Sequence, residues 1–269
     1  MNWMEVLISA GIAAILGVIT TGLRNRNKLG KIGAILWVII PIIAGNIIYY
    51  QYINPNGLRG NDRAQIEQSL ESFPVFQTLK QQEPTLYTQL IDNFLKSKKE
   101  GHSEQQRIDE MKQSIAELTV QRIRHAPDKN VIDYMNVILD ELRYYQTNNR
   151  SEHLCFKALF PQVNGGVNAT KVLPKELLMR DLDSINSLFT SSTGGLIKPE
   201  NQEYENKLNA IVGKLQQQYG HDLQMFVNPA APEVDREKIC DMAIDMYSQI
   251  LKLSPNDAGA ILRSMLGGE

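Results

Sequence analysis

Charged side chains are scarce in the first fifth of the 269-residue chain. Of its 58 Asp, Glu, Lys and Arg residues, only five lie in positions 1–58: Glu5, Arg24, Arg26, Lys28 and Lys31. The remaining 211 residues contain 24 basic and 29 acidic side chains, a net charge of −5. The chain therefore combines an apolar N-terminal part with a polar remainder. This composition excludes an intrinsically disordered chain, a basic nucleic-acid-binding protein and a simple cytosolic enzyme.

Sequence motifs that carry chemistry are also missing. The four histidines do not show the H-E-x-x-H or H-x-x-E-H spacing of zinc proteases, and there is no G-x-S-x-G, P-loop or G-x-G-x-x-G. Asp181 with Asp183, and Asp241 with Asp245, could pair for acid–base chemistry, but solvated helix faces explain most such pairs. We therefore predict no catalytic, cofactor-binding or metal-binding residues.

Two long uncharged segments dominate the N-terminal part. Residues 6–22 and 32–50 contain no charge over 17 and 19 positions. A helix that crosses a bilayer needs about 20 apolar residues, with about 17 as the lower limit. Buried core helices are the alternative, but two helices without a polar face are difficult to bury in a small domain. A cleaved signal peptide is disfavoured because the N-terminus lacks a basic region and a small-residue cleavage site. We predict a transmembrane hairpin over residues 1–50, with spans at about 4–22 and 32–50.

The orientation of this hairpin follows from the connecting loop, residues 23–31. The loop has no acidic residue and four basic ones: Arg24, Arg26, Lys28 and Lys31. The positive-inside rule places this loop in the cytoplasm and both chain termini on the opposite side. Aromatic residues expected at the outer membrane interface support this orientation: Trp3, Tyr49, Tyr50 and Tyr52. We expect a protein of the bacterial inner membrane with periplasmic N- and C-termini.

Small residues recur on one face of the first span. They are Ala10, Ala13, Ala14 and Gly17. Small side chains let membrane helices approach closely. Packing of the first span against the second is the favoured interpretation, and association with another membrane protein, including a homo-oligomer, is the alternative.

The rest of the chain has the periodicity of helices. Residues 51–61, with Pro55, Gly57 and Gly60, are expected to form a stalk. Beyond it, apolar residues recur at spacings of three and four: 131/135/138/142/145, 108/111/115/118, 239/243/246/250/253 and 204/208/211/215. Ser103 with Gln106, and Ser254 with Pro255, mark helix starts. The sequence predicts an all-α domain of about eight to ten helices over 62–269, with breaks at 161–172, 191–199 and 228–233. A division into two sub-bundles near 147–151 and a single core are both open.

The chain has only two cysteines, Cys155 and Cys240. Both follow the stalk and so belong to the domain assigned to the oxidising side of the membrane. They allow one intramolecular disulfide, and two buried free thiols are the alternative. His153 lies two positions from Cys155, which places the two side chains on different faces of a helix and disfavours a Cys–His nucleophilic pair.

Three functions are compatible with these features. The first is a structural or adaptor protein whose periplasmic domain binds another envelope component. The second is an immunity or defence protein that neutralises a toxin in the periplasm, since a moderately acidic domain suits a basic toxin. The third is a membrane-proximal enzyme acting on lipid or peptidoglycan, which would need a cleft with converging polar groups. The expected partners are therefore the lipid bilayer and an envelope protein, with no cofactor and no nucleic acid.

Overall fold

The computed structural model describes residues 62–148, 150–198 and 203–267. All regular secondary structure in these ranges is helical, which confirms the predicted all-α class for this part of the chain. Among these residues, no helix has both the length and the apolar character needed to cross a bilayer. The predicted spans, loop and stalk lie outside the described ranges, together with the residues assigned to topology, the interface and helix packing: Arg24, Arg26, Lys28, Lys31, Trp3, Tyr49, Tyr50, Tyr52, Ala10, Ala13, Ala14 and Gly17.

The helices follow one another along the chain with short connections. In order they are α4 (Asp62–Leu70), α5 (Pro74–Gln82), α6 (Pro84–Lys99), α7 (Glu104–Ile123), α8 (Asp128–Asn148), η3 (Arg150–Glu152), α9 (Leu154–Leu159), α10 (Pro161–Asn164), α11 (Ala169–Val172), α12 (Lys175–Ser191), α13 (Glu203–Tyr219), η4 (Gly220–Phe226), α14 (Arg236–Ile250) and α15 (Pro255–Leu266). Their number exceeds the predicted eight to ten. Part of the excess is the pair α10 and α11, which form single turns in the segment predicted as a break.

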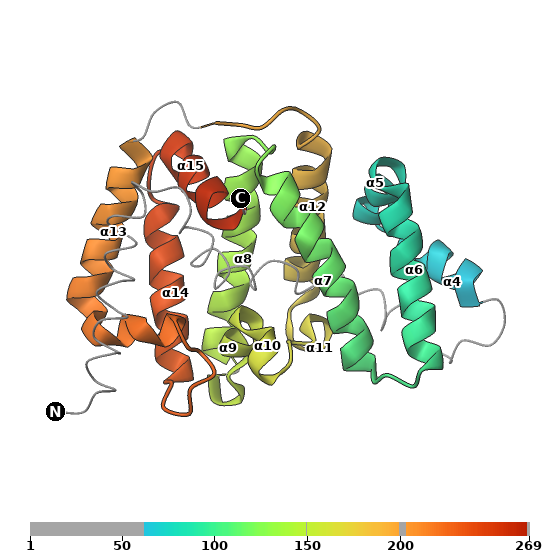
Figure 1. Cartoon of the computed structure of the whole chain (residues 1–269), viewed down its shortest axis with the longest axis horizontal. Helices are drawn as coiled ribbons and strands as arrows, with labels where there is room; N and C mark the ends of the chain where they lie inside the picture. The colour runs from blue at the N-terminus through green and yellow to red at the C-terminus, as the bar shows by residue number, and fades with distance from the viewer. Residues whose placement is uncertain (1–61, 149, 199–202, 268–269) are drawn as a thin grey trace.

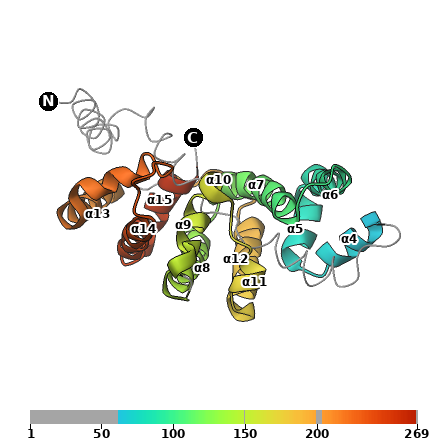
Figure 2. The ribbon, with the colours of Figure 1, turned by 90° about the horizontal axis from the view of Figure 1, so that it is seen from below.

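The long helices stand side by side in a curved row. The row runs from α4–α6 at one end, through α7, α12 and α8, to α14 and α13 at the other (Figures 1 and 2). The central helix α8 packs against α12, α15, α14 and α9. The buried apolar side chains form one continuous cluster that extends from Ile66 to Leu266.

The central position of α8 follows from its sequence. The predicted stripe lies entirely in the core, since all five members are at most 2% exposed: Val131, Met135, Ile138, Leu142 and Tyr145. Spacings of four and three residues keep these side chains on one face of a helix with 3.6 residues per turn. The stripe predicted for α14 needs a correction. Tyr247 is buried in place of Met246, which is only partly buried, and Leu253 is partly buried beyond the end of the helix.

Two predicted helix starts are confirmed. Ser103 and Gln106 form a reciprocal capping box at the start of α7. Ser254 caps α15, with Pro255 in its first turn. Each Ser side chain accepts a hydrogen bond from a backbone N–H that has no partner inside the helix.

The last helix, α15, approaches the start of α8 closely. The guanidinium of Arg263 donates to the carbonyl oxygen of Ala126 at 3.1 Å and pairs with the carboxylate of Asp128. A Cβ atom on Gly259 would lie 2.2 Å from Oδ1 of Asp128. The absence of a side chain at Gly259 therefore leaves space for Asp128, whose pair with Arg263 connects α15 to the start of α8.

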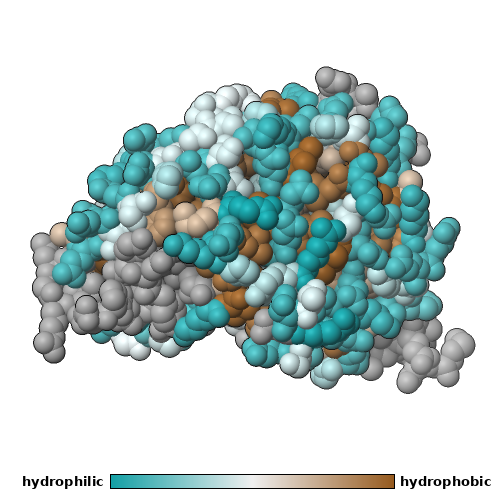
Figure 3. All heavy atoms as spheres, turned by 180° about the vertical axis from the view of Figure 1, so that it is seen from behind, coloured by the Kyte–Doolittle hydropathy of each residue, from teal (hydrophilic) through white to brown (hydrophobic). Residues whose placement is uncertain are grey.

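The face of the molecule opposite that of Figure 1 is mostly hydrophilic (Figure 3). Figure 3 shows apolar side chains as separated patches among hydrophilic residues on this face. Among the described residues, the exposed large hydrophobic side chains are Leu196, at 52%, and Val227, at 43%. Leu196 lies in the loop between α12 and α13, and Val227 directly follows η4.

Candidate interaction site beside the disulfide

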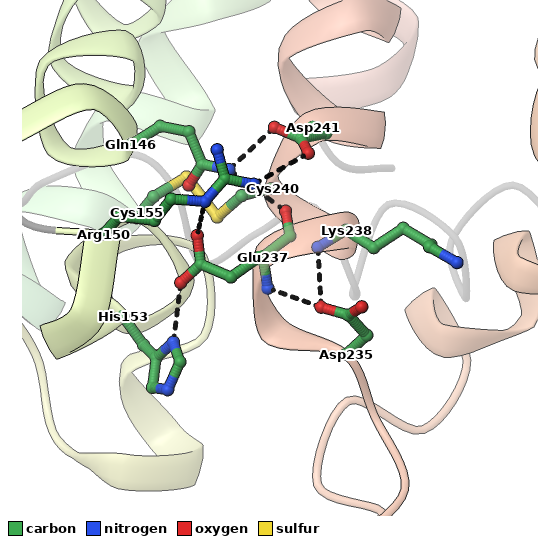
Figure 4. Close-up of a disulfide and its surroundings, with 9 residues drawn as sticks. All are labelled: Gln146, Arg150, His153, Cys155, Asp235, Glu237, Lys238, Cys240 and Asp241. Atoms are coloured by element: carbon green, nitrogen blue, oxygen red, sulfur yellow. Dashed lines mark hydrogen bonds and ion pairs between the residues drawn. A yellow bond between two sulfur atoms is a disulfide. The ribbon is translucent and has the colours of Figure 1, made fainter.

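Cys155 of α9 and Cys240 of α14 are joined by a disulfide, with their Cα atoms 6.1 Å apart (Figure 4). Of the two alternatives left open by the sequence, this geometry supports the disulfide. Both side chains are buried in the apolar core. The bond connects α14 to α9, the short α-helix that follows α8 and η3.

A network of polar contacts surrounds the disulfide. Arg150 Nε lies 2.8 Å from Glu237 Oε2, and its Nη2 lies 3.4 Å from Asp241 Oδ2. The amide of Gln146 donates to Asp241 Oδ1 at 2.7 Å and to the backbone carbonyl of Glu237 at 3.2 Å. These contacts join the end of α8 and η3 to the first turns of α14, so the disulfide and the network hold the same two parts of the fold together (Figure 4).

His153 takes part in this network through an unusual backbone conformation. Its φ of 54° is the only positive value among the described non-glycine residues. Histidine is among the few residues that tolerate the left-handed region. The His153 ring contacts Glu237 Oε1 through Nδ1 at 2.7 Å. Cys155 is part of the disulfide. His153 precedes α9 in a left-handed conformation and so does not share a helix with Cys155, contrary to what the sequence prediction assumed.

Next to this network lies a pocket of about 500 Å³ between α13 and α14. Its lining combines four carboxylates with two cationic side chains, a phenol and one apolar residue: Asp235, Glu237, Asp241, Asp245, Arg150, Lys238, Tyr219 and Ile244. The formal charge of the lining is therefore negative. Asp241 and Asp245, singled out from the sequence as an i,i+4 pair, both lie here.

The pocket side chains also stabilise the local structure. Asp235 caps α14 by accepting hydrogen bonds from the backbone N–H groups of Glu237 and Lys238, each at 3.0 Å. Asp245 accepts hydrogen bonds from the Tyr219 hydroxyl and, at 2.9 Å, from Gln218. Burial and then this hydrogen bond to Asp245 raise the pKa of Tyr219. Tyr219 therefore remains a neutral donor at physiological pH.

The carboxylates of the pocket have partners in the surrounding structure. Asp235 caps a helix and Asp245 accepts hydrogen bonds from neighbouring side chains, and the carboxylates of the lining outnumber its cationic side chains. Among residues 62–148, 150–198 and 203–267, no group of three or more His, Cys, Asp and Glu side chains is placed to hold a metal ion.

Sequence reasoning found only some of these residues. It singled out the two cysteines, Asp241 and Asp245, but it missed Arg150 and Glu237. Glu237 looks like an ordinary acidic residue in the first turn of a helix, and only the folded chain brings Arg150 to it from 87 positions away. No protein-family model matches the chain, and no curated protein or solved structure shows significant similarity to it.

Proposed function

We propose that this protein is anchored in the bacterial inner membrane by its N-terminal hairpin and that its periplasmic α-helical domain binds another protein of the cell envelope. The observation that carries the proposal is the disulfide between Cys155 and Cys240. Disulfides persist in oxidising compartments such as the periplasm and are rare in the cytosol.

The sequence before the domain supports the same location. Two uncharged segments of 17 and 19 residues flank a loop whose four charges are all basic. Such a loop is retained on the cytoplasmic side, which would leave the domain in the compartment where its disulfide is stable.

The pocket beside the disulfide is the proposed contact surface. Its four carboxylates outnumber its two cationic side chains, so we expect a partner segment that presents lysine or arginine. The same charge excess favours a second candidate, in which the domain neutralises a basic toxin in the periplasm. Suppression of toxicity by co-expression would distinguish this candidate from a constitutive envelope adaptor.

Affinity capture tests the proposal. The intact protein is cross-linked in cells and purified from solubilised membranes, and co-purified proteins are identified by mass spectrometry. The wild type is compared with Asp241→Lys/Asp245→Lys and with Asp183→Lys, which alters an exposed carboxylate on α12. We expect an envelope protein that the wild type and the Asp183 variant retain and the pocket variant loses. Recovery of the protein alone in all three samples would refute the proposal.

A reporter fused after Glu269 tests the topology independently. A periplasm-specific reporter should be active there and a cytoplasm-specific reporter inactive. The reverse result would contradict the predicted orientation and would place both cysteines in a reducing compartment.

A further inference from the structure

Two carboxyl groups lie in the middle of the helical core. Glu141 of α8 and Asp181 of α12 are each only 1% exposed. Both carboxyl oxygens of Glu141 and Oδ2 of Asp181 have no hydrogen-bond partner among the described residues. A buried ionised carboxylate without partners is very unfavourable, so these positions demand an explanation.

The two carboxyls lie at the largest helix contact of the fold. α8 packs on α12 more extensively than any other described pair of helices. Each acid occupies the apolar face of its own helix, because Glu141 lies between the buried Ile138 and Tyr145, and Asp181 lies in the same way between Leu178 and Ile185.

The buried surroundings of the two acids provide one positive charge and several phenols. Lys112 of α7 is 7% exposed, and its ammonium donates to the carbonyl oxygen of Val167 at 2.8 Å. Its charge favours ionisation of both Glu141 and Asp181. Nearer the surface, Asp140 of α8 opposes ionisation of Glu141 and Arg180 of α12 favours it, and these two side chains pair with each other. Among the described residues, these charges come from α7, α8 and α12, the three helices that meet here.

Phenols complete the surroundings. Tyr134 and Tyr145 of α8 and Tyr247 of α14 are fully buried. The charges of Glu141 and Asp181 raise the pKa of Tyr134 and Tyr145 further than burial alone. All three tyrosines are therefore neutral at physiological pH. One ammonium can balance one carboxylate, so a second ionised carboxylate would be uncompensated.

Burial raises the pKa of Asp181 to about 8, although Lys112 opposes the shift. Burial and then the neighbouring Asp181 raise the pKa of Glu141 well above its ordinary value. In the unfolded chain both groups lose their protons near pH 4. Between about pH 4 and pH 8 these two groups thus bind more protons in the folded domain than in the unfolded chain, so their contribution to stability falls as the pH rises through this window.

We infer that Glu141 and Asp181 retain a proton in the core between α8 and α12 at neutral pH, and that loss of this proton loosens the contact between the two helices. The site is thus a proton-binding site that couples the packing of the domain to pH. It belongs to the helical domain itself and does not depend on the proposed function or on membrane anchoring.

Infrared difference spectroscopy and hydrogen exchange test the inference on the full-length protein in detergent. At pH 6.5 the wild type should show the carbonyl stretch of protonated carboxylic acid, and the Asp181→Asn variant should lose part of this signal. Asp183→Asn, which changes an exposed carboxylate on the same helix, should retain it. Glu141→Gln provides a second variant if Asp181→Asn does not fold.

The exchange experiment reports on the helix contact. For the wild type, amide protection in α8 and α12 should fall by up to about tenfold for each pH unit across the window, as expected when one proton is lost on opening. The fall should be absent or strongly reduced in Asp181→Asn and unchanged in Asp183→Asn. Absence of a protonated-acid band from the wild type at pH 6.5, or equal pH dependence of protection in wild type and Asp181→Asn, would overturn the inference.

Discussion

Reduction of the disulfide should destabilise the domain without unfolding it. Cys155 and Cys240 are 85 positions apart, so the bond closes a long loop in the unfolded chain. In the chain-entropy model, a loop of this length contributes about 4.5 kcal/mol to the free energy of unfolding. Single domains are stable by about 5–15 kcal/mol, so we expect the reduced protein to be folded but much less stable.

Contacts beside the bond should preserve the native arrangement after reduction. Gln146 and Arg150 connect to Glu237 and Asp241 around the cysteines. Because both sulfur atoms are buried, two thiols would occupy nearly the same apolar space. The native state should therefore change little, and most of the effect should come from expansion of the unfolded ensemble.

Urea denaturation followed by circular dichroism measures the effect. Full-length protein in detergent is compared with and without a phosphine reductant, and thiol titration confirms reduction. The midpoint should fall, and the slope should rise because the reduced unfolded chain exposes more surface. A Cys155→Ala/Cys240→Ala variant controls for the reductant, to which it should be insensitive. A change below about 1 kcal/mol after complete reduction would refute the loop-entropy reasoning.

Four further substitutions test other parts of the structure, each through the free energy of unfolding in urea. Gly259→Ala should lower the free energy of unfolding by about 1–3 kcal/mol because the new methyl group would displace Asp128. Its control is Gly213→Ala in α13, where the space around the glycine is open. This control should raise the free energy of unfolding by up to about 1 kcal/mol. Ser254→Ala should lower it by about 1 kcal/mol through loss of the α15 cap. Asp181→Asn should raise the free energy of unfolding at pH 8 and have little effect at pH 3, because burial raises the pKa of Asp181 and the unfolded carboxyl loses its proton near pH 4.

The predictable parts of the fold are those determined by residues close together in the sequence. The stripe of α8 and the caps at Ser103 and Ser254 follow from residue spacing and from side chains within one turn of the helix start. The helices α10 and α11 were missed because their segment is rich in Gly and Asn. Their position depends on long-range packing, for example of Ala169, which is fully buried.

The interpretation of Asp181 as part of a solvated pair was wrong. It rested on residue type, since aspartate is seldom buried, although Asp183 is indeed exposed. The position carried a usable signal, because Asp181 follows Leu178 by three residues and precedes Ile185 by four, and all three are buried. The ion pairs of Arg150 gave no such signal, since they depend on how distant segments meet.

The buried acids and the disulfide act on different neighbours of α8. Loss of the core proton would weaken the contact of α8 with α12, whereas the bond between Cys155 and Cys240 ties α9 to α14. At alkaline pH the oxidised protein should therefore lose amide protection first in α12 and keep it in α14. Reduction should narrow this difference, because α14 loses its covalent link to α9 although its packing and polar contacts remain. Equal loss of protection in α12 and α14 of the oxidised protein would show that the two features belong to one cooperative unit.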